Sequence, residues 1–349
     1  MDRYRLSQRL AGIGLVVLFL VGCGASATND YSNVVKLGVI QGPSEGIASV
    51  ASSPDGSIVA YGNYSDNSVR LVDVSTGKEI MTLEGHATAV TSLAFSPDGR
   101  LLASTGTVNL PPDKDGTVRI WNISTGQQLA VFETPGINGL AFSPDGALLA
   151  GAGVGDPVQI ILWDVETLSE KKTVSNVFNT ISFSPDGGFM ASGSRDEAVH
   201  IFEVATGKEV ISLSGHNGLV SATIFSPNGE LLASGGDDTT IQVWNTKTGK
   251  RLKSLTGHTT AVDFLAFSPD GRVLASLGSG IKITRSGGQI ELSFSSEDKF
   301  VRFWDIEAGQ QIGSIELPEG ISVVSFNPEW TLIATGTGEG VIQLWGVKK

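Results

Sequence analysis

Ser96-Pro97-Asp98-Gly99 is one of seven related tetrapeptides, the last being the degenerate Asn327-Pro328-Glu329-Trp330, and their spacing decides the predicted fold. They are centred on Pro54, Pro97, Pro144, Pro185, Pro227, Pro269 and Pro328. Successive prolines are 43, 47, 41, 42, 42 and 59 residues apart, so one unit has been duplicated and twice lengthened. A single period through most of the 349 residues predicts one closed body without an internal domain boundary.

The second unit shows what each copy contains. Strands are predicted at 90–95, 101–104, 117–121 and 128–132, where short apolar runs are separated by turn residues. Proline presets the φ of the first central turn position, and Asp-Gly tolerates the conformation that follows. Each unit is therefore expected to form a small antiparallel sheet of four strands. The apolar residues face both sides of the sheet, and stacking the sheets around an axis covers both.

Two dipeptides recur in register with these turns. Trp-Asp stands at Trp163-Asp164 and Trp304-Asp305, with variants in the other units, and Gly-His stands at Gly85-His86, Gly215-His216 and Gly257-His258. In these features residues 33–349 resemble the Trp-Asp (WD) repeat β-propeller family. The resemblance implies an all-β, seven-bladed β-propeller of four-stranded antiparallel blades. It also implies a scaffold that binds other proteins.

The resemblance further implies a buried hydrogen-bonded set in a blade, formed by the Gly-His imidazole, a hydroxyl, a turn aspartate and a tryptophan. Such a set satisfies both imidazole nitrogens and stabilises the blade. Three blades carry all four members: His86, Ser104, Asp115 and Trp121; His216, Ser234, Asp238 and Trp244; and His258, Ser276, Asp298 and Trp304. The blades centred on Pro54, Pro144, Pro185 and Pro328 lack at least one member.

The two ends of the array predict how the ring closes. The last unit ends after 341–345 with four further residues, which leaves it without a fourth strand. The apolar segment 34–40 precedes the first unit and has no partner of its own. We expect this segment to supply the outer strand of the last blade.

Two insertions join the second strand to the third, in blades two and six. The first contains Leu110, Pro111 and Lys114, and the second contains Ile281, Lys282, Ile283 and Arg285. Alternating apolar and polar residues on both sides of 286–288 predict that the second insertion is a β-hairpin. Both should project from the face that bears the Gly-His loops, as opposite walls of a partner-binding surface. Neutral variation of surface loops is the alternative interpretation.

The N-terminus has the pattern of an export signal. Three arginines within the first nine residues precede the apolar stretch 10–22, which is too short to span a bilayer as a helix. Leu20-Val21-Gly22-Cys23 resembles a bacterial lipobox, which implies cleavage before Cys23 and a lipid on its sulfur. The expected organisation is a signal peptide (1–22), a lipidated N-terminus and tether (23–33) and the propeller (34–349). Cleavage near Ala25-Ser26-Ala27, releasing a soluble secreted adaptor, is the alternative.

Composition narrows the function. A formal net charge of −12 without a Lys/Arg block disfavours nucleic-acid binding. The four histidines are better explained structurally than catalytically, and no motif predicts a metal site, a cofactor or a phosphate-binding loop. We therefore expect a non-catalytic, monomeric scaffold, held in the bacterial cell envelope by an N-terminal lipid and facing away from the cytoplasm. The alternative is a hydrolase-like enzyme with its active site at the central channel.

Overall fold

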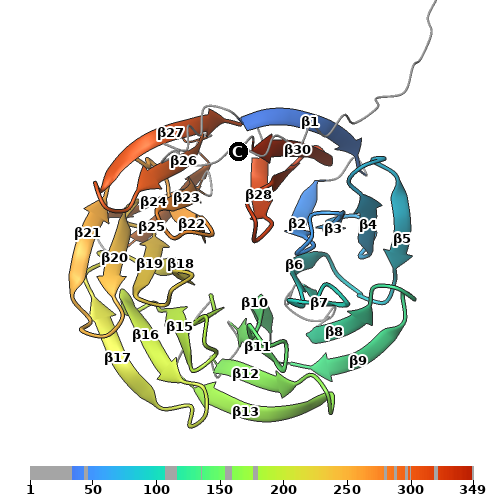
Figure 1. Ribbon diagram of the computed structural model, residues 1–349, viewed down its shortest axis with the longest axis horizontal. Coiled ribbons are helices and arrows are strands. Elements are labelled where there is room, and N and C mark those ends of the chain that lie inside the picture. The colour runs from blue at the N-terminus through green and yellow to red at the C-terminus, as the bar shows by residue number, and fades with distance from the viewer. Residues whose placement is uncertain are drawn as a thin grey trace, which may run out of the picture. The chain divides into compact units, whose positions relative to one another are not determined.

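A computed structural model describes residues 34–42, 46–106, 116–134, 136–153, 159–175, 180–278, 281–286, 289–294, 298, 300–317 and 321–347. Seven antiparallel sheets of four strands each follow one another around a ring (Figure 1). The predicted all-β, seven-bladed propeller is thus confirmed.

Blades 1 to 4 take their strands in chain order, from the centre of the ring to its rim. Blade 1 contains β2 (Ile47–Ser52), β3 (Ile58–Asn63), β4 (Val69–Asp73) and β5 (Glu79–Leu83). Blade 2 contains β6 (Val90–Phe95), β7 (Leu101–Gly106), β8 (Thr117–Asn122) and β9 (Gln128–Glu133). Blade 3 contains β10 (Ile137–Phe142), β11 (Leu148–Gly153), β12 (Gln159–Asp164) and β13 (Ser169–Ser175). Blade 4 contains β14 (Ser182–Phe183), β15 (Phe189–Gly193), β16 (Ala198–Glu203) and β17 (Glu209–Ser214).

Blades 5 to 7 complete the ring. Blade 5 contains β18 (Val220–Phe225), β19 (Leu231–Gly236), β20 (Ile241–Asn245) and β21 (Arg251–Leu255). Blade 6 contains β22 (Val262–Phe267), β23 (Val273–Gly278), β26 (Phe300–Asp305) and β27 (Gln310–Glu316). Blade 7 contains β28 (Ile321–Phe326), β29 (Leu332–Thr337), β30 (Val341–Val347) and, as its outer strand, β1 (Val34–Gln41).

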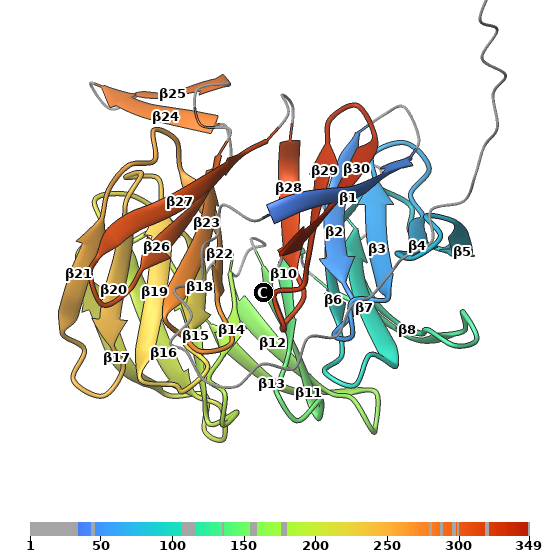
Figure 2. The same cartoon turned by 45° about the horizontal axis from the view of Figure 1, so that its top comes forward.

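The first and last strands of the described chain close the ring, as the sequence predicted. β1 pairs antiparallel with β30, from Val34 opposite Val347 to Gln41 opposite Val341. Ile40 is buried in the same apolar cluster as Ile342 of β30 and Ile47 of blade 1. The N-terminal strand therefore joins two blades that lie at opposite ends of the sequence (Figures 1 and 2).

The repeated tetrapeptide forms the tight turn between the first two strands of a blade. In blade 2 the Gly99 amide donates to the Ser96 carbonyl oxygen at 2.9 Å, and the Ser96 hydroxyl donates to Asp98 Oδ1 at 2.6 Å. The Leu101 amide donates in turn to Ser96 Oγ at 2.9 Å. Gly99 has a φ of +71°, a conformation that favours glycine. The side chains of one serine and one aspartate thus complete the hydrogen bonds of the turn at the point where the next strand begins.

The last turn departs from this pattern because Trp330 occupies the position of the glycine. Trp330 has a φ of +54°, which strains a bulky residue. Its ring is buried, with its centroid 5.0 Å from that of Phe326 and 6.0 Å from that of Phe303. Burial of the indole offsets the strain, so the degenerate tetrapeptide still makes a turn and also packs the junction of blades 6 and 7.

The core lies between the blades rather than at one centre. Seven apolar clusters each join two neighbouring blades. The cluster between blades 1 and 2, for example, combines Leu71 of β4 with Leu102 of β7 and Trp121 of β8. Each sheet is covered on both faces by its neighbours, which explains its apolar residues on both faces.

The second insertion is a β-hairpin, as predicted. β24 (Ile281–Ser286) pairs antiparallel with β25 (Gln289–Phe294), with Ser286 opposite Gln289. The hairpin forms its own two-stranded sheet between β23 and β26 and stands clear of blade 6 in Figure 2. The first insertion, with Leu110, Pro111 and Lys114, lies outside the described residues.

No helix in the described part of the chain is long and apolar enough to cross a membrane.

Candidate functional site

Blade 5 brings together all four members of its predicted set. His216 Nδ1 lies 2.9 Å from Asp238 Oδ2, and His216 Nε2 lies 2.7 Å from Ser234 Oγ. Trp244 Nε1 donates to the same Ser234 Oγ at 2.9 Å. The Asn217 amide donates to Asp238 Oδ2 at 2.9 Å. The set ties the Gly-His loop to β19, to β20 and to the turn between them.

Blade 6 has the same arrangement with one additional member. His258 lies 2.8 Å from Asp298 Oδ2 through Nδ1 and 2.6 Å from Ser276 Oγ through Nε2, and Trp304 Nε1 donates to Ser276 Oγ at 2.7 Å. Arg302 Nη2 donates to Asp298 Oδ1 at 3.0 Å. The arginine was not part of the predicted set, although the sequence places it two residues before the tryptophan of the set, on β26. Although the hairpin separates Ser276 from Asp298 along the chain, the set is complete.

Blade 2 shows three of its four members. His86 Nε2 lies 2.8 Å from Ser104 Oγ, and Trp121 Nε1 donates to Ser104 Oγ at 2.8 Å. Asp115 lies outside the described residues. Blade 7 has a reduced version, in which Trp345 Nε1 donates to Thr335 Oγ1 at 3.3 Å.

The aspartates of these sets are held in the charged form. Burial raises the pKa of Asp238, but hydrogen bonds from His216 and from the Asn217 amide outweigh burial and lower it to about 2. Burial also raises the pKa of Asp298, and the contact with His258 outweighs it, so that the pKa is again lowered. Because the folded pKa lies below the unfolded value near 3.8, the charged carboxylate stabilises the fold at pH values above the unfolded pKa. This stability is lost as the pH falls through the folded pKa.

The chemistry of these sets is structural. Both nitrogens of His216 and of His258 are engaged by neighbouring side chains, and all three imidazoles of the sets are buried. The fourth histidine, His200 on β16, contacts Asp196 and Glu209 on the rim. Within the described ranges, no group of three or more His, Cys, Asp or Glu side chains is arranged to hold a metal ion.

The two faces of the ring carry different features. The connection from β23 to β26, which contains the hairpin, is at the same end of blade 6 as the loop that contains His258. The tetrapeptide turns and the turns after the third strands lie at the opposite end. Of the predicted binding residues in the second insertion, Ile281, Lys282, Ile283 and Arg285 all lie on β24. The structure describes how β24 pairs with β25, but it does not describe the side chains of these four residues.

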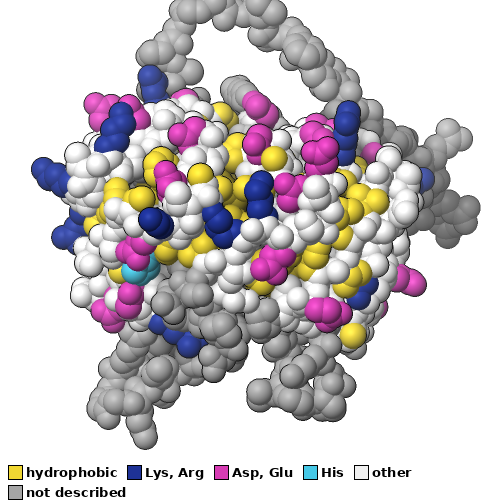
Figure 3. All heavy atoms as spheres, turned by 90° about the horizontal axis from the view of Figure 1, so that it is seen from below, with side chains coloured by type: hydrophobic (Ala, Val, Ile, Leu, Met, Phe, Trp, Pro, Cys, Tyr) yellow, Lys and Arg dark blue, Asp and Glu magenta, His cyan; other side chains and the backbone are white. Residues whose placement is uncertain are grey.

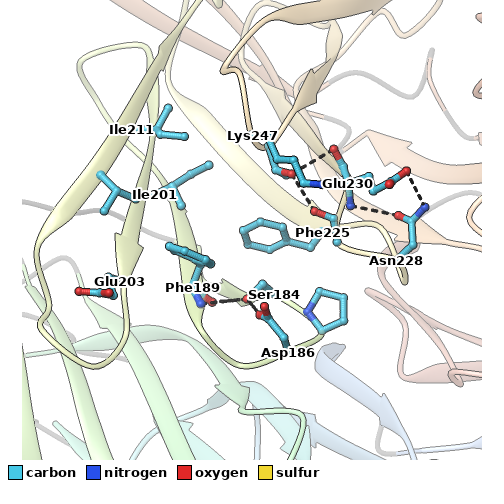
Figure 4. Close-up of a pocket in the computed structure, with 14 residues that line it drawn as sticks. Ser184, Asp186, Phe189, Ile201, Glu203, Ile211, Phe225, Asn228, Glu230 and Lys247 are labelled. Atoms are coloured by element: carbon cyan, nitrogen blue, oxygen red, sulfur yellow. Dashed lines mark hydrogen bonds between the residues drawn. The ribbon is translucent and has the colours of Figure 1, made fainter.

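Sequence reasoning missed a groove on the face of the tetrapeptide turns. It lies between blades 4 and 5 and has a volume of about 860 Å³. Phe189, Ile201 and Ile211 of blade 4 face Phe225 and the turn of blade 5 across it (Figure 4). Phe189 is 38 % exposed and Val210, at the rim, is 48 % exposed. The sequence does contain a signal for this groove. The residue after the third strand is Thr246 in this unit, whereas the other units have Val or Ile there.

The rim carries further exposed apolar side chains at corresponding places. On the side of the ring drawn in Figure 3, apolar side chains lie among charged side chains of both signs. Ile80, Leu252 and Ile312 are 51 %, 44 % and 47 % exposed on the outer strands of blades 1, 5 and 6. Single exposed apolar residues of this kind are common on protein surfaces, whereas the groove between blades 4 and 5 brings two of them, Phe189 and Val210, into one concave site.

The chain matches the family described as WD domain, G-beta repeat. The matched segments are residues 35–73, 77–122, 126–156, 166–203, 207–245 and 249–305, which together cover more than half of the chain. The chain therefore belongs to this family of WD-repeat propellers, whose general role is to mediate protein–protein interactions. No curated protein that was compared with the chain matches it.

The matched segments do not coincide with the blades. Segment 77–122 begins in the turn just before the outer strand of blade 1, β5, and ends at the third strand of blade 2, β8. Most repeats in the sequence therefore span two neighbouring blades, which locks each blade to the next. Strands β28, β29 and β30 of the seventh blade, which include the degenerate tetrapeptide between β28 and β29, lie outside the matched segments, whereas its outer strand β1 lies within segment 35–73.

Proposed function

We propose that this protein is a lipid-anchored scaffold of the bacterial cell envelope, which holds a protein-binding propeller outside the cytoplasm without catalysing a reaction. The observation that carries the proposal is the combination of a WD-repeat ring with the lipobox-like Leu20-Val21-Gly22-Cys23 in front of it. Acyl chains on Cys23 would supply stable anchoring, and residues 24–33 would form a short tether.

The histidine sets support a binding role. Two of the four histidines, His216 and His258, are buried within hydrogen-bonded sets. The net charge of −12 favours partners with basic surfaces and disfavours nucleic acids. The hairpin β24–β25 and the insertion at 105–114 are the proposed walls of a binding surface on the Gly-His face.

Anchoring is tested by replacing the proposed lipid attachment residue. We expect Cys23→Ser to lose metabolic labelling with palmitate and to leave the precursor uncleaved, because the thiol accepts the diacylglyceryl group before cleavage. Ser26→Ala, in the proposed tether, should be labelled and processed as the wild type is. Blocking lipoprotein signal peptidase should make the wild-type precursor accumulate, and normal processing under that block would contradict the anchor.

Protein binding is tested by mild crosslinking in native membranes, followed by purification of the full chain. We expect a reproducible envelope partner, and we expect shortening of 281–294 to a tight turn to reduce its recovery. Far-UV circular dichroism and the melting temperature control for folding, since the hairpin is a sheet of its own. Undiminished recovery with the shortened hairpin would place partner binding elsewhere on the ring, and no crosslinked partner at all would contradict the scaffold.

A further inference from the structure

We propose that the groove between blades 4 and 5 binds an extended segment of a partner protein that inserts a bulky apolar side chain and carries Lys or Arg beside it. The inference rests on the proposed scaffold function and adds a second binding surface, on the face opposite to the Gly-His loops.

The groove between blades 4 and 5 lies at a junction where an aliphatic seal between blades is missing. The seal consists of two residues that pack against the apolar cluster of a junction. One is the first residue of the second strand in one blade, and the other is the residue just after the third strand in the next blade. Four other junctions have such a pair. These pairs are Ile58 with Ile123, Leu101 with Val165, Leu231 with Ile306, and Leu332 with Val74. The corresponding pair between blades 4 and 5 is Phe189 and Thr246. Among the described residues, the cluster of this junction includes neither of them.

Hydrogen bonding and exposure explain why this pair leaves the junction open. Thr246 Oγ1 donates to the Gly229 carbonyl oxygen at 2.7 Å and lies 3.1 Å from that of Glu230, which holds the hydroxyl on the turn of blade 5. Phe189 leaves 38 % of its surface exposed instead of entering the cluster. The result is a concave site with an apolar floor and an aromatic wall.

The floor of the groove selects the inserted side chain. Its apolar residues are Phe189, Ile201, Val210, Ile211 and Phe225. A volume of about 860 Å³ lies within the roughly 300–1,000 Å³ of common ligand sites. Aromatic or branched aliphatic side chains of a partner would bury the exposed surface of Phe189 and Val210.

The edge of the groove selects the charge of the neighbouring residues. Asp186, Glu203 and Glu230 contribute three carboxylates, against the single cation of Lys247. The Ser184 hydroxyl lowers the pKa of Asp186, which keeps this carboxylate charged. An excess of negative charge around an apolar floor favours a segment that is apolar at its centre and basic at its flanks.

The groove at the next junction supports this assignment by contrast. It lies between blades 5 and 6, has a smaller volume of about 630 Å³, and includes Ile306 of the seal. Its charged residues are balanced, with Lys253 and Arg272 against Asp305 and Glu307. Both junctions have a groove, and of the two only the junction between blades 4 and 5 combines an open seal with an acidic edge.

The experiment uses the full chain in detergent and an array of short synthetic peptides. Each peptide has a central Phe, Leu or Ile, flanked either by Lys and Arg or by Glu. We expect binding of basic-flanked peptides only. The affinity of the tightest peptide is then measured by fluorescence anisotropy. The double variant Phe189→Leu with Thr246→Ile installs the pair found at Leu231 and Ile306. We expect it to weaken peptide binding at least about tenfold. The melting temperature of this variant should be unchanged or higher.

Val210 and Ile80 provide a matched pair of rim substitutions, because they occupy the same position on β17 and β5. Val210→Ser should weaken peptide binding by about threefold or more, whereas Ile80→Ser should leave it within about twofold. The inference is overturned if no peptide binds, if acidic-flanked peptides bind equally well, or if the double variant binds as the wild type does. If crosslinked partners are still recovered in any of those cases, the scaffold function stands and only the groove assignment fails.

Discussion

Ser276 has a larger structural role than a small hydroxyl residue usually has, because its Oγ meets both His258 Nε2 and Trp304 Nε1. All three side chains are buried. We expect Ser276→Ala to lower the free energy of unfolding by about 2–3 kcal/mol, since two buried polar groups lose their shared partner. Urea denaturation followed by circular dichroism measures the change.

Thr335 provides the control for Ser276, because it occupies the same position in blade 7 but lies 3.3 Å from a half-buried Trp345. We expect Thr335→Ala to cost less than about 1 kcal/mol. Equal losses in the two variants would mean that the histidine adds nothing to the set in blade 6.

At the scale of the element, a polar contact joins the third and fourth strands of several blades. Arg70 contacts Glu79 in blade 1, and His200 contacts Glu209 in blade 4 at 3.0 Å. Arg119 with Gln128 and Arg302 with Gln311 occupy the same positions in blades 2 and 6. Only the contact in blade 4 contains a group that titrates near neutral pH, so it makes the pairing of β16 with β17 sensitive to pH.

The pH dependence of blade 4 has a definite sign. Burial lowers the pKa of His200, but the hydrogen bonds with Glu209 and Asp196 outweigh burial and raise it above 6.5. The stabilising contribution is therefore fully present below about pH 6.5 and is lost as the pH rises through the folded pKa. We expect the melting temperature of His200→Gln to lie below that of the wild type at pH 6 and to approach it at pH 9. Differential scanning calorimetry at both pH values measures the difference.

Arg70→Gln is the matched control for this experiment. Arg70 makes the corresponding contact in blade 1 and stays charged throughout this range. Its substitution should lower the melting temperature by similar amounts at both pH values. A constant effect of His200→Gln would show that the histidine contact does not depend on protonation.

At the scale of the whole molecule, stability depends on closing the ring with β1. Deleting residues 34–41 would leave the edge of β30 unpaired and remove Ile40 from the cluster between blades 7 and 1. We expect the melting temperature to fall by at least about 5 °C and the unfolding transition to broaden. Deleting residues 24–33 instead, which retains β1, should leave both unchanged. A similar transition for the two deletions would contradict closure by this strand.

The parts of the structure that could be predicted are those with a local cause. The tetrapeptide encodes its own turn through the side chains of residues such as Ser96 and Asp98, so seven copies specify seven sheets. The hairpin at 281–294 has its own alternation and turn residues. The sets of blades 5 and 6 were predictable through the family resemblance, because the repeats place their members at matching positions. Arg302 escaped prediction although its contact with Asp298 spans only four residues and the same pair stands at Asp66 and Arg70 in blade 1.

The sequence by itself determined the number of blades, their strand order and the strand that closes the ring. Each of these follows from a repeated local pattern, from the unpartnered strand before the first unit and from the missing fourth strand of the last unit. Only the tertiary structure decided that the junction between blades 4 and 5 stays open. That property belongs to a pair of residues from different repeats, Phe189 and Thr246, which line the same groove from two blades. Whether such a pair seals a junction depends on side-chain packing and on the hydrogen bond of Thr246 to the neighbouring turn, and neither has a period that the sequence displays.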